Sequence, residues 1–140
     1  MSSDIESTAD VHMVVAARAE NVAVVRQVVC ALTESIGLPR PVREDVRIAV
    51  TEACSNVVRH AYAGNQGPMA VSVSDAGDRL RVEVVDRGCG MGATGAGGGA
   101  GLGLPIISAI ADLVEIGDAP EAGSRVAMSF AHDPLELAAS

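Results

Sequence analysis

The stretch that most constrains how this chain can fold covers residues 42–61, VREDVRIAVTEACSNVVRHA. Its apolar residues recur at the 3.6-residue spacing of an α-helix, and they are Val42, Val46, Ala49, Val50, Ala53, Val57 and Val58. This spacing predicts one helix of about five turns with one side against a core. Glu52, Asn56 and His60 follow one another at intervals of four residues, so they share one narrow face of that helix. Such a face is either a functional site or a solvated edge, and the rest of the chain has to distinguish the two.

The composition indicates a single acidic domain. With 140 residues the chain is long enough for one hydrophobic core, and hydrophobic residues make up 49% of it. It has no Trp, one Tyr and one Phe, so it lacks the aromatic platforms on which single-stranded nucleic acids stack. Its formal net charge of -8 also repels nucleic-acid phosphates and anionic membranes. We therefore expect no direct nucleic-acid partner and no membrane partner.

The cysteines and the N-terminal sequence bear on the compartment. Cys30, Cys54 and Cys89 are odd in number and widely spaced, and their spacing suits no zinc site. Because the first two fall within helical patterns, small buried hydrophobes are favoured over metal ligands or a disulfide. The first ten residues lack the features of a signal peptide, and no apolar stretch approaches the ~20 residues of a membrane span. We expect a soluble, cytoplasmic protein in a reducing compartment.

The remaining patterns predict an α+β fold. Helices are expected at residues 20–36 and 104–112, and strands at 11–17, 69–75, 80–86, 113–116 and 124–130. A glycine-rich run follows the hairpin of the second and third strands, and because glycine costs a helix ~1 kcal/mol per residue, we expect a loop there. The prediction is a two-layer α/β sandwich over residues 10–131, with a mixed, mostly antiparallel sheet covered by helices on one face. Residues 1–9 and 132–140 are expected to be flexible tails.

Strand alternation places two polar side chains on the buried side of the sheet. Asp86 has the parity of the apolar residues Leu80, Val82 and Val84, and Ser124 has that of Val126, Met128 and Phe130. A buried carboxylate needs hydrogen-bond donors, and an inward carboxylate beside an inward hydroxyl can bind the amino edge of a purine. The alternative is that Asp86 only caps the end of its strand by bonding to its own turn.

The glycine-rich run ends at Gly101-Leu-Gly103, directly before a predicted helix. Free backbone N–H groups and the positive end of a helix dipole at this point suit phosphate binding. A Walker A loop is excluded because the chain contains no lysine. The segment Gly90-Met-Gly92-Ala-Thr-Gly95 matches a dinucleotide fingerprint only formally, since more glycines and no helix follow it. A plain flexible linker is the alternative.

The polar face of the long helix offers the complementary groups. The amide oxygen of Asn56 suits Mg²⁺ together with phosphate oxygens and waters. Glu52, one turn earlier, could act as a general base on a hydroxyl or a water. Arg59 or His60, one turn later, could face a nucleotide.

Taken in order, these motifs resemble the Bergerat-fold (GHKL) ATPases over residues 10–131. The N box matches Glu52 and Asn56, the G1 box Asp86-Arg-Gly88-Cys-Gly90, the G2 box Gly101-Leu-Gly103, and the G3 box Gly123-Ser124. The small size and the wording EACSNVVRHAY are similar to the bacterial anti-sigma-factor serine-protein kinases.

The resemblance implies roles for particular residues. Asp86 would contact the adenine amino group, Asn56 would be the ligand of Mg²⁺, and Glu52 would be the catalytic base for transfer of the γ-phosphate of ATP. The expected nucleotide contacts are Asn56, Arg59, His60, Asp86, Gly88, Gly90, Met91, Gly101, Leu102, Gly103, Leu104 and Ser124. Ser124 stands where many relatives have Thr, which keeps the hydroxyl.

The resemblance also implies partners. The substrate would be a serine or threonine of a STAS-domain anti-anti-sigma factor, the sequestered partner a sigma factor, and the protein itself a homodimer. Residues 91–100, within the expected ATP lid, contain no Arg or Lys, although a cation there would stabilise transfer. Arg59 or Arg87 could substitute, or the protein could be a non-catalytic sequestering module that binds ATP without spending it. The ATP-binding half of a histidine kinase is disfavoured, because no dimerisation helix with a phosphoacceptor His precedes the domain.

Overall fold

We describe a computed structural model of the chain, covering residues 10–62, 64–88, 103–119 and 123–132. The elements in chain order are β1 (Val11–Ala16), α2 (Ala19–Ser35), α3 (Arg40–Asn56), the π-helix η1 (Val57–Ala61), β2 (Pro68–Asp75), β3 (Arg79–Asp86), α5 (Gly103–Ile110), β4 (Leu113–Asp118) and β5 (Ser124–Ala131). Over these residues, no helix combines the length and the apolar character needed to cross a membrane.

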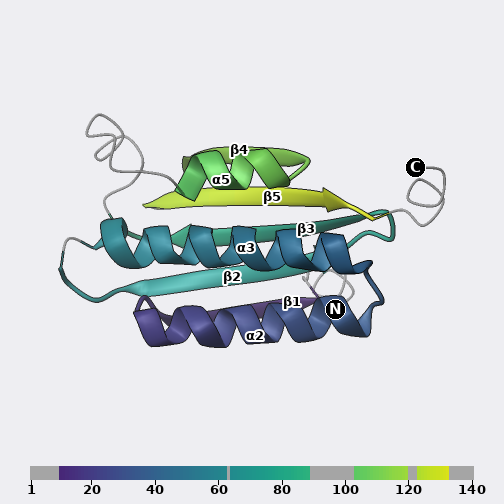
Figure 1. Cartoon of the computed structure of the whole chain (residues 1–140). Coiled ribbons are helices and arrows are strands. Elements are labelled where there is room, and N and C mark those ends of the chain that lie inside the picture. Colours follow the sequence, from purple (N-terminus) through teal and green to yellow (C-terminus); the bar gives the residue numbers. More distant parts are fainter. Residues whose placement is uncertain (1–9, 63, 89–102, 120–122, 133–140) are drawn as a thin grey trace, which may run out of the picture.

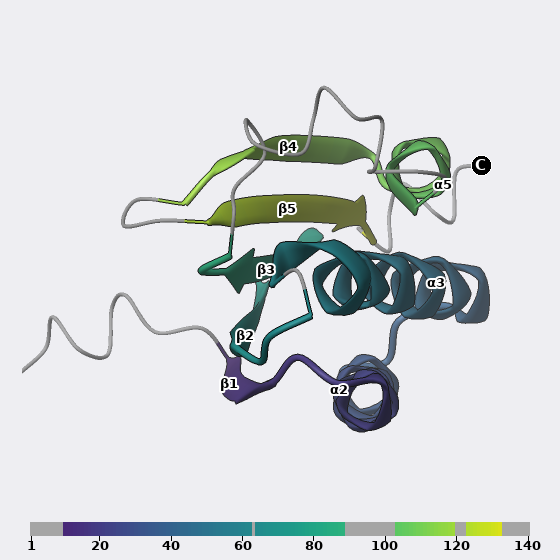
Figure 2. The same ribbon diagram turned by 90° about the vertical axis from the view of Figure 1, so that its left-hand side faces the viewer.

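The strands form one five-stranded sheet in the order β1-β2-β3-β5-β4. Each of its pairings is antiparallel, so the expectation of a mixed sheet is wrong for the described residues. The helices α2, α3 and α5 all lie on one face of the sheet, as the predicted two-layer sandwich requires (Figures 1 and 2). The central helix α3 lies between the other two and crosses the middle of the sheet (Figure 1).

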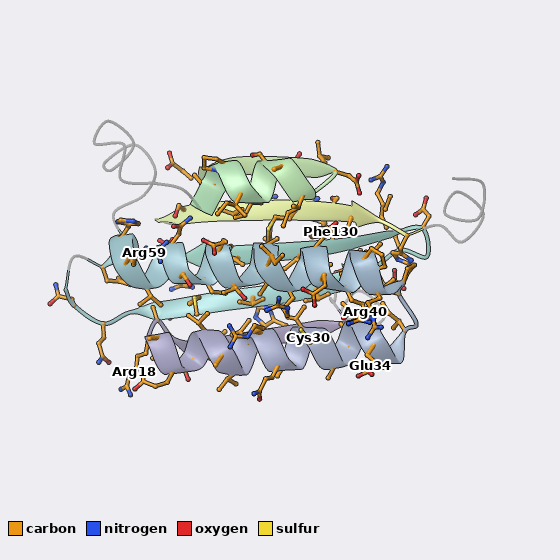
Figure 3. All side chains as sticks on the ribbon, viewed as in Figure 1. Arg18, Cys30, Glu34, Arg40, Arg59 and Phe130 are labelled. Carbon is orange, nitrogen blue, oxygen red and sulfur yellow. The ribbon has the colours of Figure 1, made fainter. Side chains whose placement is uncertain are left out.

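The core lies between these two layers and follows the predicted periodicities. From α3 it takes Val46, Ala49, Val50, Ala53 and Cys54, and from the inward face of the sheet Val71, Val73, Leu80, Val82, Val84, Met128 and Phe130. Burial raises the pKa of the Cys54 thiol to about 12, so Cys54 is a small hydrophobe here, as predicted. Cys30 is half-buried between α2 and α3 (Figure 3), and Cys89 lies outside the described residues.

The long helix differs from its prediction at both ends. It begins at Arg40 with Pro41 in its first turn, where a missing N–H costs nothing. It stops being an α-helix at Asn56, because its last turn is the π-helix η1. Single π turns are often found at functional sites, and this one has no periodic signature in the sequence.

Two other observed boundaries differ from the predicted ones, because residues near them bond to the sheet. α5 ends at Ile110 rather than residue 112, since the Asp112 N–H donates to Ser129 O and its Oδ2 accepts from the Ala131 N–H. His132 was expected to begin a flexible tail, but it is only 8% exposed. Its Nε2 lies 2.6 Å from Oδ1 of Asp75, and its N–H donates to Asp78 O, so it packs onto the β2–β3 hairpin.

Candidate functional site

The site begins with a buried carboxylate at the end of β3. Asp86 is 3% exposed, and strand alternation turns it toward the helical layer, as predicted. Its Oδ1 accepts the N–H groups of Gly88 at 2.9 Å and Ser124 at 3.2 Å. Its Oδ2 accepts the Ser124 hydroxyl at 2.6 Å. Asp86 therefore caps its own turn, as the alternative interpretation expects, and it also pairs with the inward hydroxyl of β5, while its binding of a purine amino group stays a prediction.

The carboxylate retains capacity for one further donor. Each carboxylate oxygen can accept about two hydrogen bonds. Two N–H groups fill Oδ1, whereas Oδ2 has the Ser124 hydroxyl alone among the donors that the described residues supply. Asp86 can therefore accept a ligand amino group at Oδ2 without losing any bond that holds it in place.

The polar face of α3 supplies the second part of the site. Glu52 and Asn56 are both half-buried, one helical turn apart. The Glu52 carboxylate has no hydrogen-bond or ion-pair partner within the part of the chain that the structure describes. A carboxylate in that condition is free to accept a proton from a bound hydroxyl.

Asn56 is engaged by a neighbour on the following turn. Its Oδ1 accepts a hydrogen bond of 2.9 Å from Nη2 of Arg59. Arg59 is exposed and lies at the same end of the helical layer as Arg18, opposite the end that carries Glu34 and Arg40 (Figure 3). His60 is half-buried in η1.

Close backbone packing joins the helix end to the turn after Asp86. A Cβ added at Gly88 would lie 1.9 Å from the backbone oxygen of Ala61, so only glycine permits this approach. A Cβ at Gly123 would lie 2.0 Å from the backbone oxygen of Asp86, at a residue whose φ is +91°. Gly88 and Gly123 thus hold η1, the end of β3 and the start of β5 against one another.

One tyrosine ties the same segments together. The Tyr62 hydroxyl donates to Pro68 O at 2.5 Å and accepts the Arg87 N–H at 2.8 Å. Tyr62 could not be predicted as part of the site from the sequence, because its partners depend on tertiary contacts beyond the end of the helix. The one available signal was that Tyr62, the sole tyrosine, closes the EACSNVVRHAY stretch.

The remaining predicted contacts fall in two groups. Gly103 begins α5, where N–H groups of the first turn lack helical partners, and Leu104 packs against the hydrophobic core. The start of α5 lies at the same end of the molecule as the end of α3 (Figure 1). Gly90, Met91, Gly101 and Leu102 lie outside the described residues.

The donor set of the described residues fits Mg²⁺ held jointly with phosphate. Among these residues, no group of three His, Cys, Asp or Glu side chains could hold a metal by itself. Mg²⁺ commonly binds one or two protein oxygens and fills its octahedron with phosphate oxygens and waters. The amide oxygen of Asn56 is an oxygen donor of this kind, and it accepts a hydrogen bond from Arg59 in this structure.

Comparison with known proteins identifies the family of this domain. The profile of the histidine kinase-like ATPase domain matches residues 15–130, which include Glu52, Asn56, Asp86 and Ser124. This chain belongs to that family. The fold and the resemblance predicted from the motifs are thereby confirmed.

Individual curated proteins show which members of the family this chain is similar to. A serine-protein kinase RsbW of Bacillus cereus (strain Q1) is 36% identical over 78 residues, which are 56% of this chain and 49% of that protein. The RsbW of Bacillus mycoides (strain KBAB4) is 33% identical over 84 residues, 60% of this chain and 52% of that protein. The chain therefore spans about half the length of the curated relatives it matches.

A solved structure supports the fold. The RsbU and RsbW domains of Rv1364c from Mycobacterium tuberculosis match with a TM-score of 0.65 at 22% identity. The match covers 86% of this chain and 32% of that one.

Proposed function

We propose that this protein is an ATP- and Mg²⁺-dependent protein serine/threonine kinase that also acts as an anti-sigma factor. It phosphorylates a STAS-domain anti-anti-sigma factor and sequesters a sigma factor, as a homodimer in the cytoplasm. The observation that carries the proposal is that Ser124 holds Asp86 inward at the ends of β3 and β5, while the helix that carries Glu52 and Asn56 packs through its last turn against Gly88, two residues after Asp86. The relatives' name, serine-protein kinase, supports the reaction.

Each residue has a defined task in this proposal. ATP, bound with Mg²⁺, supplies the γ-phosphoryl group. Asp86 accepts the adenine amino group at Oδ2, while Ser124 and Gly88 keep the carboxylate in place. Asn56 offers its amide oxygen to the metal, and the first turn of α5 offers N–H groups to phosphate.

Glu52 has the catalytic task. Its half-buried carboxylate accepts the proton of the attacking serine or threonine hydroxyl as the hydroxyl oxygen bonds to the γ-phosphorus of ATP, the bridging phosphorus–oxygen bond breaks and ADP leaves. Arg59 and Arg87 are cations that could offset charge on the transferring group, because residues 91–100 contain no Arg or Lys.

The test is phosphotransfer from labelled ATP to STAS-domain proteins of the same organism, identified by capture on this chain with and without ATP. Wild type should label one Ser or Thr, and Glu52→Gln should lower the rate by about 10²- to 10⁴-fold. Glu44→Ala is the matched control, because Glu44 lies on the same helix but pairs with Arg47 at the surface. Equal labelling by Glu52→Gln and wild type would contradict the role of Glu52.

A second candidate is a sequestering module that binds ATP without transferring phosphate. The cation-free segment 91–100 favours it. It predicts nucleotide-dependent capture of a sigma factor, loss of nucleotide binding in Asp86→Ala, and no labelled STAS protein under any condition. Detectable labelling that requires Glu52 would exclude this candidate.

A further inference from the structure

Tyr62 lies where three segments of the site meet. It directly follows η1, its hydroxyl donates to Pro68 O at the start of β2, and the same oxygen accepts the N–H of Arg87 after β3. The hydroxyl therefore uses its one donor and accepts one backbone hydrogen bond. One side chain thus bridges the backbone at the start of β2 and the backbone after β3.

The ring of Tyr62 is held as firmly as its hydroxyl. A Cβ added at Gly67 would lie 2.2 Å from Cε1 of Tyr62, so the ring lies directly against the backbone of Gly67. The side chain is half-buried and packs against the hydrophobic core. Because the ring cannot rotate into Gly67, the hydroxyl position is fixed relative to the backbone of β2.

The group that Tyr62 holds is next to Asp86. The Arg87 N–H belongs to the peptide that joins Asp86 to Arg87, so fixing this N–H fixes the plane of that peptide. The following turn is closed by the Gly88 N–H on Asp86 Oδ1 and by contact of Gly88 with Ala61 O. The orientation of the Asp86 carboxylate therefore depends on where Tyr62 places the Arg87 N–H.

We propose that Tyr62 is a positioning residue for base recognition, which fixes the Asp86–Arg87 peptide so that Asp86 selects a purine amino group. This inference rests on the proposed nucleotide-binding function. Through Tyr62, the helix that carries Asn56 and the turn that carries Asp86 keep one relative position.

The variant Tyr62→Phe removes the hydroxyl and keeps the ring. It removes the hydrogen bond to Pro68 O and the one from the Arg87 N–H, and a side chain–backbone hydrogen bond of this kind is worth about 3- to 10-fold in an equilibrium. ADP and IDP are the probes, because IDP has a carbonyl oxygen where ADP has the amino group. Wild type should prefer ADP, and Tyr62→Phe should lower ADP affinity about 3- to 10-fold with a smaller loss for IDP, which reduces the preference.

The matched control is Thr33→Val, which removes a hydroxyl that donates to Cys30 O at 3.0 Å within α2. It should leave the ADP to IDP preference unchanged. An equal loss of affinity for ADP and IDP in Tyr62→Phe would mean a merely structural role and would overturn the inference. Affinities for ADP and IDP that are the same as in wild type would also overturn it.

Wild-type behaviour separates this inference from the proposed function. If wild type binds no ADP, the proposed function fails and the inference with it. If wild type binds ADP and Tyr62→Phe binds like wild type, only the inference fails.

A second variant covers the case in which Tyr62→Phe does not fold. A Cβ at Gly67 would lie 2.2 Å from Cε1 of Tyr62, so Gly67→Ala has to displace the ring while the hydroxyl is kept. Tyr62 is the only Tyr and the chain has no Trp, so intrinsic fluorescence reports on this displacement. Gly67→Ala should shift the emission and reduce the preference for ADP over IDP, and a shifted emission with an unchanged preference would overturn the inference.

Discussion

At the scale of single residues, a metal ion that binds Asn56 has to displace the hydrogen bond from Arg59. Nη2 of Arg59 donates to Oδ1 of Asn56, the atom proposed to bind Mg²⁺. A guanidinium and a divalent cation compete for the same oxygen and repel each other. Arg59 also lines an open hollow of about 280 Å³ between α2 and α3.

Replacing Arg59 should therefore strengthen metal-dependent binding. Arg59→Leu removes the guanidinium from the Asn56 oxygen and keeps an apolar side chain at position 59. Because an exposed hydrogen bond to a charged group is worth about 1 kcal/mol, the affinity for Mg²⁺–ADP should rise by up to about fivefold. ADP is used because it lacks the γ-phosphate that Arg59 could reach. The measurement is calorimetric titration with Mg²⁺ and with EDTA.

The EDTA titration is the internal control, since the gain should vanish without metal. An equally large gain in EDTA would show that Arg59 opposes the nucleotide itself, which contradicts competition at Asn56.

Much of the site could be predicted at this scale, and the reason is geometric. Strand alternation alone gives the inward direction of Asp86 and Ser124, and helical spacing alone puts Glu52 and Asn56 on one face. The hydrogen bond that joins Asp86 to Ser124 spans 38 residues and depends on the pairing of β3 with β5. Tyr62 could not be found because periodicity ends where its helix ends.

At the scale of elements, the glycines after β3 and before β5 decide how closely η1 approaches the sheet. The start and end of each strand were predicted within a few residues, because the apolar alternation ends there. The π turn was not predicted, since a change from α to π geometry over one turn leaves the spacing of the apolar residues almost unchanged. Its contact with Gly88 could be seen only in the assembled fold.

Gly88→Ala should separate the helix end from this turn. The new Cβ would lie 1.9 Å from Ala61 O and 2.5 Å from Ala61 C, both backbone atoms, so the turn has to move. Overpacking of this kind costs about 1–3 kcal/mol of folding free energy, and we expect ADP affinity to fall further because Asp86 moves with the turn. Urea unfolding and ADP titration measure the two effects.

Gly77→Ala is the matched control. Gly77 also lies next to a strand of the same hairpin and has a φ of +96°, but a Cβ there meets nothing within 4 Å. It should cost stability through backbone strain alone and leave ADP affinity unchanged. Equal ADP affinity in Gly88→Ala and wild type would contradict the proposed link between η1 and Asp86.

At the scale of the whole molecule, the two halves of the proposed site come from opposite layers. Asp86 and Ser124 belong to the sheet, whereas Glu52 and Asn56 belong to the helices that cover it (Figure 2). A ligand that contacts both layers stabilises their packing, because it binds the folded chain and not the unfolded one. Nucleotide binding should therefore be measurable as thermal stability.

At a hundredfold excess over its dissociation constant, Mg²⁺–ADP should stabilise wild type by about 2.7 kcal/mol. For a domain of this size that free energy corresponds to a rise in Tm of roughly 5–15 °C. Asp86→Asn should lose most of this rise, since it replaces an acceptor oxygen by a donor. Asn56→Ala should keep the part that ADP produces in EDTA and lose the part added by Mg²⁺. Differential scanning calorimetry measures both changes in Tm, with Glu44→Ala as the control. If Asn56→Ala kept the whole rise in Tm that Mg²⁺ adds to ADP, Asn56 would not be a ligand of the metal.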